Sequence, residues 1–162
     1  HASNSNLNYG TTDAAVFTNG AQSDFKHIVI TEEKVSSGNA ALKIYVNGVD
    51  TAFSILGGGF FVISEANFEA FDSGGLEFNI GAINDDGTQD TFYDGLIDEV
   101  AVFGKALSSS EVTAIYKSGV PKDESDHHRL TLYYRFDDNV NDTDGTSNGT
   151  NNGATFSSTV PS

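Results

Sequence analysis

Cysteine, methionine and tryptophan are absent from this 162-residue chain, and proline occurs only twice. Without cysteine there is no disulfide framework, no thiolate metal site and no cysteine nucleophile, so the core alone must hold the fold together. No apolar run is long enough to span a bilayer, and no Gly-x-Ser-x-Gly nucleophile elbow is present. We therefore expect no membrane insertion, and the sequence gives no sign of a serine or cysteine hydrolase.

Positive charge is scarce in the chain. Eight Lys and Arg residues stand against 23 Asp and Glu residues, which gives a net charge of -15 at pH 7. Such a charge repels polyanions and has the wrong sign for phosphate neutralisation, so we expect no nucleic-acid partner and no anionic membrane surface. An acidic protein also attracts cations, although a solvated acidic surface without a specific ion is the commoner case.

Short β-rich runs separated by Gly, Asn and Asp predict a single all-β domain over residues 1–162, built as an antiparallel sandwich rather than from βαβ units. Asn47-Gly48 supplies two residues that tolerate positive φ and predicts a tight hairpin turn, and 84–87 predicts a second turn. The predicted strands are 14–17, 25–31, 42–46, 49–55, 60–63, 76–83, 96–103, 130–136 and 154–156.

One short helix is predicted after the 96–103 strand. Ser108 is placed to cap it, and Glu111 completes a Ser-x-x-Glu capping box. An apolar stripe follows at 112, 115 and 116, and Gly119 with Pro121 then ends the helix. Residues 120–129 are polar and charged, and we interpret them as a linker between a main body, 1–119, and a C-terminal strand segment, 130–162.

Two stretches carry a family resemblance. The first joins the 25–31 strand, the Tyr45-Val46-Asn47-Gly48 hairpin, the 95–103 strand with Ile97-Asp98-Glu99-Val100, and the 106–116 helix. The second is 132–137, Leu-Tyr-Tyr-Arg-Phe-Asp, with the Asn- and Gly-rich residues up to 156. Together they resemble the laminin-G-like domain of the concanavalin A-like lectin and glucanase superfamily. The resemblance implies a two-sheet antiparallel jelly-roll sandwich with one short helix.

The two stretches stand in reversed order, because in that family the second opens the domain and the first ends it. The chain is then circularly permuted, or cut from a tandem array, or it donates its C-terminal strand to a neighbour. Ten linker residues reach about 30 Å, which permits the strand to complete its own sheet and equally permits donation to another copy of the chain. An incomplete sheet edge would favour either solution.

The same resemblance implies a structural calcium ion. Family members often hold Ca²⁺ near positions that match Asp98 and Asp137, with Asp142 and neighbouring carbonyls as further candidate ligands. Calcium takes six to eight oxygen ligands, so acidic side chains from two segments suit it. The alternative is that Asp98 caps a strand irregularity while the loop aspartates form Asx turns.

Catalysis and sugar binding are judged from a few side chains. Asp98 and Glu99 are adjacent and would face opposite sides of a regular strand, so they do not form the carboxylate pair of a glycoside hydrolase, and we expect no enzyme activity. Sugar binding normally uses an aromatic platform. With no Trp in the chain, the candidate ligand-binding residues are Tyr9 and Tyr93, beside the Phe60-Phe61 pair.

The Asn-x-Thr sequons at Asn141 and Asn148 are candidate glycosylation sites and fit export. We therefore predict an extracellular or cell-surface, noncatalytic recognition or adhesion module that binds a glycan or an extracellular protein and holds a structural Ca²⁺. The alternative hypothesis is a structural subunit of an extracellular filament, surface layer or particle, which is assembled from copies of the chain by C-terminal strand donation.

Overall fold

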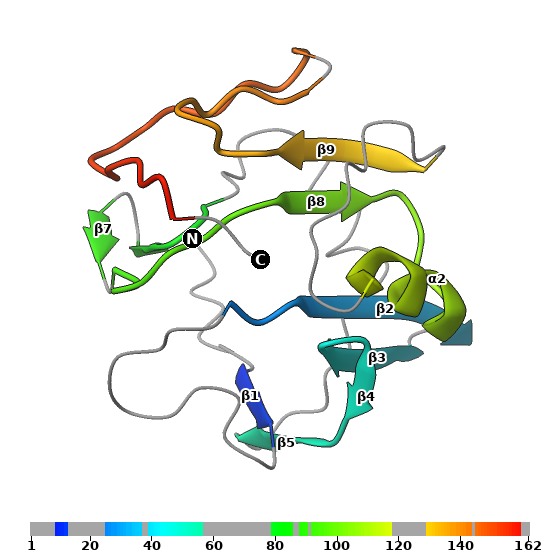
Figure 1. The fold of residues 1–162 in the computed structure, drawn as a ribbon. Coiled ribbons are helices and arrows are strands. Elements are labelled where there is room, and N and C mark those ends of the chain that lie inside the picture. The colour runs from blue at the N-terminus through cyan, green and yellow to red at the C-terminus, as the bar shows by residue number, and fades with distance from the viewer. Residues whose placement is uncertain are drawn as a thin grey trace.

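The computed structural model describes residues 9–12, 25–36, 39–56, 79–85, 88–90, 92–117, 129–143 and 145–159. The predicted strands at 14–17 and 60–63, and all of the predicted linker except Arg129, lie outside these residues. The elements are β1 (Tyr9–Thr12), β2 (Ile28–Ser36), β3 (Asn39–Val46), β4 (Val49–Thr51), β5 (Phe53–Leu56), β6 (Ile83–Asp85), β7 (Thr88–Asp90), β8 (Val100–Phe103), α2 (Ser109–Tyr116) and β9 (Leu130–Tyr134). Figure 1 shows their arrangement.

Every strand pairing in the described part of the chain is antiparallel. The ladders join β1 with β5, β2 with β3, β3 with β4, β6 with β7, and β8 with β9. The described residues include one helix, α2, which lies close to β2, β3 and β4 (Figure 1). Within these ranges no helix has the length and apolar character needed to cross a membrane.

The hairpin between β3 and β4 forms where it was predicted. Asn47 and Gly48 both have positive φ, 50° and 77°, as a two-residue turn of this kind requires. The turn is tied back to the start of the sheet, because the His27 N–H donates to the Asn47 side chain at 3.0 Å and the Asn47 N–H donates to the His27 carbonyl at 2.8 Å. Val46 and Val49 are then opposite each other in the ladder.

The helix packs on one face of this three-stranded sheet. Val112 is fully buried beside Tyr45 and Leu107, and partly buried side chains from β2, β8 and α2 surround them: Val29, Phe103 and Ile115. A Cβ at Gly48 would lie 2.8 Å from the Tyr116 ring, so the turn needs glycine for space as well as for its φ. The hydrophobic core therefore fixes the direction in which the chain leaves β8.

The predicted capping box of α2 is confirmed. The Glu111 N–H donates to the Ser108 hydroxyl at 3.3 Å, and the Ser108 N–H donates to the Glu111 carboxylate at 2.7 Å. The helix closes at Lys117, a left-handed residue with φ 41° whose N–H donates to the Thr113 carbonyl. The helix therefore ends two residues before Gly119, which lies outside the described residues.

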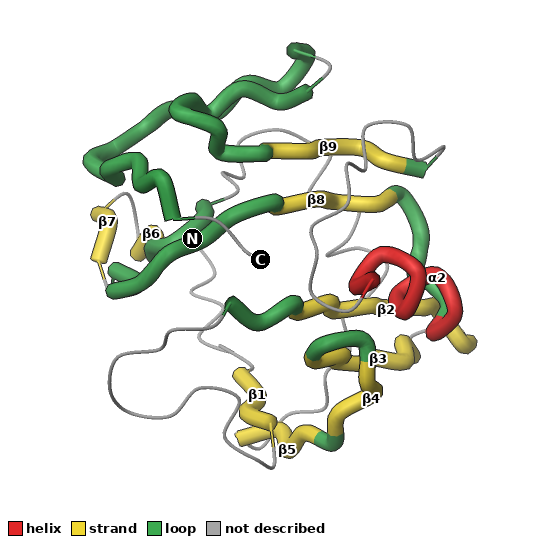
Figure 2. The backbone as a smooth tube through the Cα atoms, in the orientation of Figure 1, coloured by secondary structure: helices red, strands yellow, loops and turns green. Residues whose placement is uncertain are grey.

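Several predicted strand boundaries were wrong. The 96–103 strand begins only at Val100, because Glu99 has φ 53° and interrupts the extended backbone. Likewise β9 ends at Tyr134, ahead of the left-handed Phe136 with φ 58°. The 49–55 strand divides at Ala52 into β4 and β5. Residues 80–82 form bends before β6, and 154–156 is loop rather than strand (Figure 2).

Strand β9 lies between β8 and a later part of the same chain. On one side the ladder pairs Val100 with Tyr134 and Phe103 with Leu130. On the other side both backbone groups of Tyr133 are used: its N–H donates to the Asp142 carboxylate at 2.9 Å, and its carbonyl accepts the Thr143 N–H at 2.9 Å. The outer edge of β9 is therefore covered at Tyr133.

Candidate functional site

An acidic cluster forms where the residues before β8 meet the residues after β9. Asp98 and Glu99 come from the first segment, and Arg135 with Asp137 comes from the second. The Arg135 Nε lies 3.0 Å from the Asp137 Oδ2. Burial is the main cause that raises the pKa of Asp98, with a further contribution from the negative charge of Asp137. The two carboxylates are thus close enough to repel each other.

Glu99 is held in this cluster by a tyrosine from β9. The Tyr133 side chain is 1% exposed, and its hydroxyl donates a hydrogen bond to the Glu99 carboxylate. Burial raises the pKa of Glu99, the hydrogen bond from Tyr133 opposes that rise, and the charge of Asp98 adds to it. The expectation that Asp98 and Glu99 face opposite sides of a regular strand does not apply, because both precede β8 and Glu99 is left-handed.

Asp142 has a different environment from the other candidate aspartates. It is 4% exposed, and one carboxylate oxygen accepts the Tyr133 N–H, while the other lies 3.4 Å from the Thr146 hydroxyl. Its own N–H donates to the Asn148 side chain at 3.0 Å. Asp142 thereby links β9 to the loop that follows it.

The loop after β9 borders an open hollow of about 370 Å³. Asp137 and Asp142 both line it, with polar neighbours from the same loop: Arg135, Asn139, Asn141, Thr143, Gly145 and Asn148. Two Asx contacts stiffen the rim, since the Asn141 N–H donates to the Asn139 side chain and the Asn139 amide donates to the Asp137 carbonyl. Asp98 is outside this lining, and in the described residues no three His, Cys, Asp or Glu side chains gather as a metal-holding group.

Exposed apolar side chains concentrate in the loop before β8. Phe92 is 67% exposed and Tyr93 is 50% exposed, and Leu96 and Ile97 follow them at the surface. The Tyr93 ring rests on the backbone of Gly95, where an added Cβ would lie 2.6 Å from the ring. The Tyr93 N–H donates to the Gly81 carbonyl at 2.8 Å, so both the backbone and the ring of Tyr93 are positioned. The other candidate, Tyr9, lies in β1, and its side chain is outside the described set.

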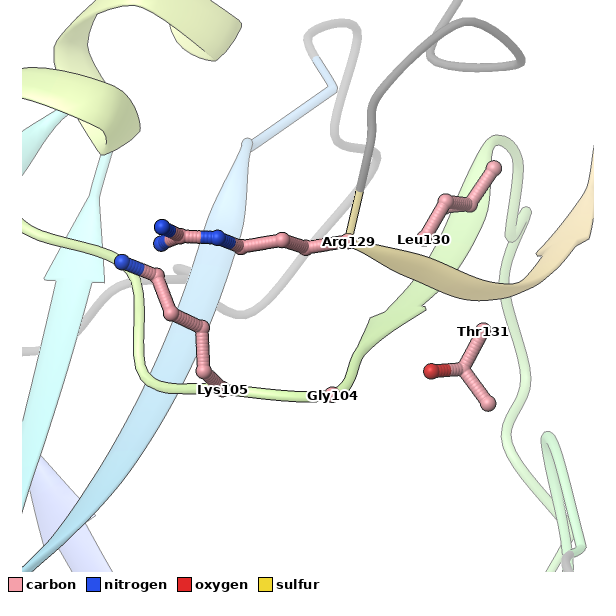
Figure 3. A pocket seen from close by; sticks show the side chains of 5 residues that line it. All are labelled: Gly104, Lys105, Arg129, Leu130 and Thr131. Atoms are coloured by element: carbon pink, nitrogen blue, oxygen red, sulfur yellow. The ribbon is translucent and has the colours of Figure 1, made fainter.

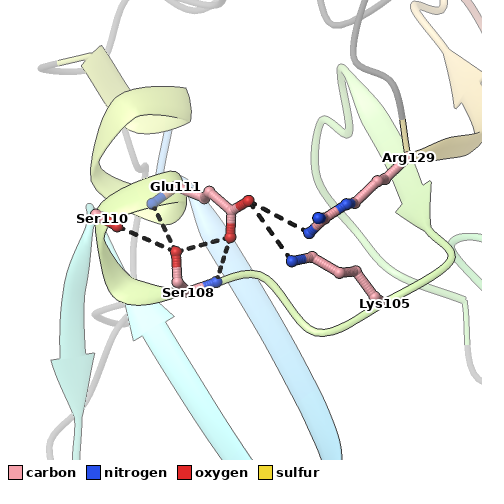
Figure 4. A network of polar contacts seen from close by, with 5 residues as sticks. All are labelled: Lys105, Ser108, Ser110, Glu111 and Arg129. Carbon is pink, nitrogen blue, oxygen red and sulfur yellow. Dashed lines mark hydrogen bonds and ion pairs between the residues drawn. The ribbon is translucent and has the colours of Figure 1, made fainter.

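A second hollow, of about 420 Å³, was missed by the sequence reasoning. Gly104, Lys105, Arg129, Leu130 and Thr131 line it, at the point where β8 ends and β9 begins (Figure 3). Figure 4 shows Glu111 between its cap serine and the two cations, with Lys105 at 3.8 Å and Arg129 at 3.6 Å from one carboxylate oxygen. Arg129 had been assigned to a linker, and only its proximity to the capping box after folding reveals this contact.

The two sequon asparagines lie beside the first hollow and are exposed. The side-chain oxygen of Asn148 accepts the Asp142 N–H, and the Asn148 side-chain nitrogen takes no part in that hydrogen bond. At Asn141 the backbone N–H is used in the Asx contact. Their glycosylation stays a prediction.

The antiparallel ladders, the capped helix after β8 and the surface loop before it are features of an all-β lectin-type sandwich. Comparison with known families agrees: the family described as the concanavalin A-like lectin/glucanases superfamily, laminin G type 3, matches residues 2–113. The chain belongs to this family. Neither the curated proteins nor the solved structures gave a match to the chain.

Membership confirms the predicted fold class, an all-β concanavalin A-like sandwich, and the predicted family resemblance. At the superfamily level it makes the chain a carbohydrate- or protein-binding module. Lectin-type domains of this family are generally noncatalytic and typically extracellular. The match ends before β9, so the C-terminal strand lies beyond the matched residues.

Proposed function

We propose that this protein is an extracellular, noncatalytic recognition module that binds neutral glycans through the loop of residues 92–97. The observation that carries this proposal is the exposed aromatic pair Phe92 and Tyr93, with the Tyr93 ring seated on Gly95. Membership in a lectin-type family supports it.

The physical argument concerns the Tyr93 ring. A sugar stacks its C–H face on an aromatic ring, and a ring that is already fixed loses little conformational freedom on binding. The contact with Gly95 and the hydrogen bond to Gly81 supply that fixing. Asp94 adds an exposed polar group of the kind that orients sugar hydroxyls.

Charge decides the class of glycan. A chain of net charge -15 repels sialylated or sulfated sugars at a distance, and Asp94 repels them at the loop itself. Uncharged hexoses and their oligomers experience no such repulsion. The proposal therefore predicts neutral oligosaccharides as ligands.

The test is a screen of neutral and acidic oligosaccharides against the full chain, followed by calorimetric titration with Tyr93→Ala and Tyr93→Phe. Loss of a stacking ring worth about 1.5 kcal/mol weakens binding roughly tenfold in the Ala variant, whereas Phe keeps the ring. Phe156→Ala is the matched control, because Phe156 is exposed in the C-terminal loop. Binding of no neutral glycan, or equal affinity in Tyr93→Ala, would refute the proposal and favour a protein ligand.

We further propose that Asp98 and Asp137 hold a structural Ca²⁺. Asp98 is partly buried, and burial and the charge of Asp137 raise its pKa, so a cation between the two carboxylates would stabilise the charged form of Asp98. The remaining ligands would be carbonyls, Asn amide oxygens and water, since in the described residues no three His, Cys, Asp or Glu side chains are placed to hold a metal together. Arg135 already pairs with Asp137 and competes with the ion.

Calorimetry and thermal unfolding with calcium or chelator test this site. We expect calcium to raise the unfolding temperature of the natural chain, and Asp98→Asn or Asp137→Asn to abolish the rise. Asp50→Asn is the control, because Asp50 is exposed on β4. An equal calcium response in all three variants would assign the effect to general screening of the negative charge.

A further inference from the structure

The C-terminal segment, described over residues 129–143 and 145–159, makes several contacts within itself. The Tyr134 hydroxyl donates to the Ser147 carbonyl at 2.6 Å, and the Gly149 N–H donates to the Val140 carbonyl at 2.8 Å. Asp142 adds the bond from the Tyr133 N–H. The strand and the loop that follows it thus make one unit.

The segment meets the rest of the chain along strand β8. Strand β9 pairs with the four residues of β8, and the Gly104 N–H donates to the Arg129 carbonyl at 3.0 Å. Side-chain contacts include the Tyr133 hydroxyl with Glu99 and the Arg129 guanidinium with Glu111. These contacts lie at β8, at Glu99 just before it and at the start of α2, and no disulfide adds to them because the chain has no cysteine.

The acceptor surface lies within the residues that match the family, and β9 follows them. Residues 2–113 match the family and contain β8 and most of α2, whereas β9 follows after residues 118–128. A connection of eleven residues, called the tether below, spans at most about 35 Å. A strand on a tether of this length docks on β8 by the same contacts whichever copy of the chain supplies it.

We propose that β8, with Gly104 and Glu111 at its end, is a strand-acceptor surface whose partner is the C-terminal segment of a second copy of this chain. Exchange of an identical element between copies keeps every contact of the single chain. Its only cost is that β9 no longer belongs to the same chain as the β8 on which it docks, so the tether no longer keeps the two strands close together. For a connection of this length, the advantage of the tether corresponds to an effective concentration on the order of 1 mM. Closed monomers therefore dominate in dilute solution, and exchanged copies accumulate toward millimolar concentration.

The absence of cysteine allows a direct test with two full-length single-cysteine chains. Val102 and Leu132 are opposite each other in the β8–β9 ladder, and opposed antiparallel residues have Cα separations of about 4.5–5.5 Å, which suits a disulfide. Val102→Cys chains are mixed with differently tagged Leu132→Cys chains at 10 µM and at 1 mM, then oxidised. Neither chain contains both cysteines, so this disulfide forms only when β9 of one copy pairs with β8 of another.

The matched control is a second pair of single-cysteine chains, Ile44→Cys and Thr51→Cys. These positions are opposite each other across β3 and β4, which a two-residue turn keeps in one chain. The control mixture therefore reports random collision. A Val102→Cys, Leu132→Cys double variant checks that the geometry permits the bond, and its intrachain form locks the monomer.

We expect the Val102→Cys and Leu132→Cys mixture to give heterodimer well above the control, with a yield that rises at least tenfold from 10 µM to 1 mM. The oxidised double variant should stay monomeric by light scattering at 1 mM while the natural chain forms dimers. The proposal is overturned if the yield of heterodimer is no greater than in the control while the double variant forms its disulfide within one chain. It is also overturned if the double variant forms no disulfide at all, because β9 would then not lie on β8. Glycan binding plays no part in either readout.

Discussion

Removal of the Asp142 carboxylate tests how the C-terminal strand is held. This side chain is nearly completely buried and accepts the N–H of Tyr133, which itself is buried in β9. Asp142→Ala leaves that N–H without its acceptor, because the neighbouring ladder uses other groups of β9. Asp142→Asn keeps an oxygen at the same place and removes only the charge.

The expected cost follows from these contacts. A buried donor left unsatisfied costs about 1–3 kcal/mol, and a hydrogen bond to a charged acceptor is worth about 1.5–3 kcal/mol, so we expect about 3 kcal/mol for Asp142→Ala. Asp142→Asn loses only the charge assistance and should cost about 1 kcal/mol. The total stability of a domain is about 5–15 kcal/mol, so the loss expected for Asp142→Ala is a large part of it.

Urea unfolding of the full chain, read as the free energy of unfolding from the midpoint and slope, measures both variants. The series is repeated with calcium and with chelator, because Asp142 is also a candidate calcium ligand. A structural carboxylate gives the same loss in both conditions, whereas a ligand gives a loss that disappears with chelator. The reasoning is refuted if the free energy of unfolding of Asp142→Ala lies within about 0.5 kcal/mol of that of the natural chain, both with calcium and with chelator.

Two further substitutions test local features. Ser108→Ala removes the cap of α2 and should cost about 1 kcal/mol in urea unfolding, while the neighbouring Ser109→Ala should cost less, since Ser109 makes no cap. Burial raises the pKa of Glu32 above 4.5, so the folded chain binds this proton more tightly and stability falls as pH rises through that raised pKa. Glu32→Gln should therefore raise the unfolding temperature more at pH 7 than at pH 4. An equal rise at both pH values would contradict this, and so would a matching rise in Glu33→Gln, whose side chain is exposed.

Local chemistry made the hairpin and the helix start predictable. Asn47-Gly48 and the Ser108-x-x-Glu111 box each depend on residues within four positions of one another, and both form as predicted. The family assignment was equally accessible, because its motifs are short and ordered. In contrast, strand ends depended on single left-handed residues such as Glu99, whose φ no alternation pattern reveals.

The site was predictable only in part, for a related reason. Sequence reasoning named Asp98 and Asp137, and the structure places them within electrostatic reach. It did not find Tyr133 as the partner of Glu99, or Arg129 beside Glu111, because those contacts join residues separated by 34 and 18 positions through the β8–β9 pairing. Asp142 was named for its charge, whereas its observed contact is a backbone hydrogen bond.

The position of the acidic cluster connects the calcium proposal with strand exchange. Asp98 comes from the segment before β8, and Asp137 comes from the C-terminal segment, so both carboxylates meet only when β9 is docked. A cation held between them binds the docked state alone and stabilises it by RT ln(1 + [Ca²⁺]/Kd), about 2.7 kcal/mol at a hundredfold excess over Kd. That stabilisation is the same whether β9 comes from its own chain or from another, so calcium should slow exchange between copies without changing the final proportion of exchanged chains. If calcium instead shifted that proportion at equilibrium, the ion would have to contact the tether or a surface formed between copies.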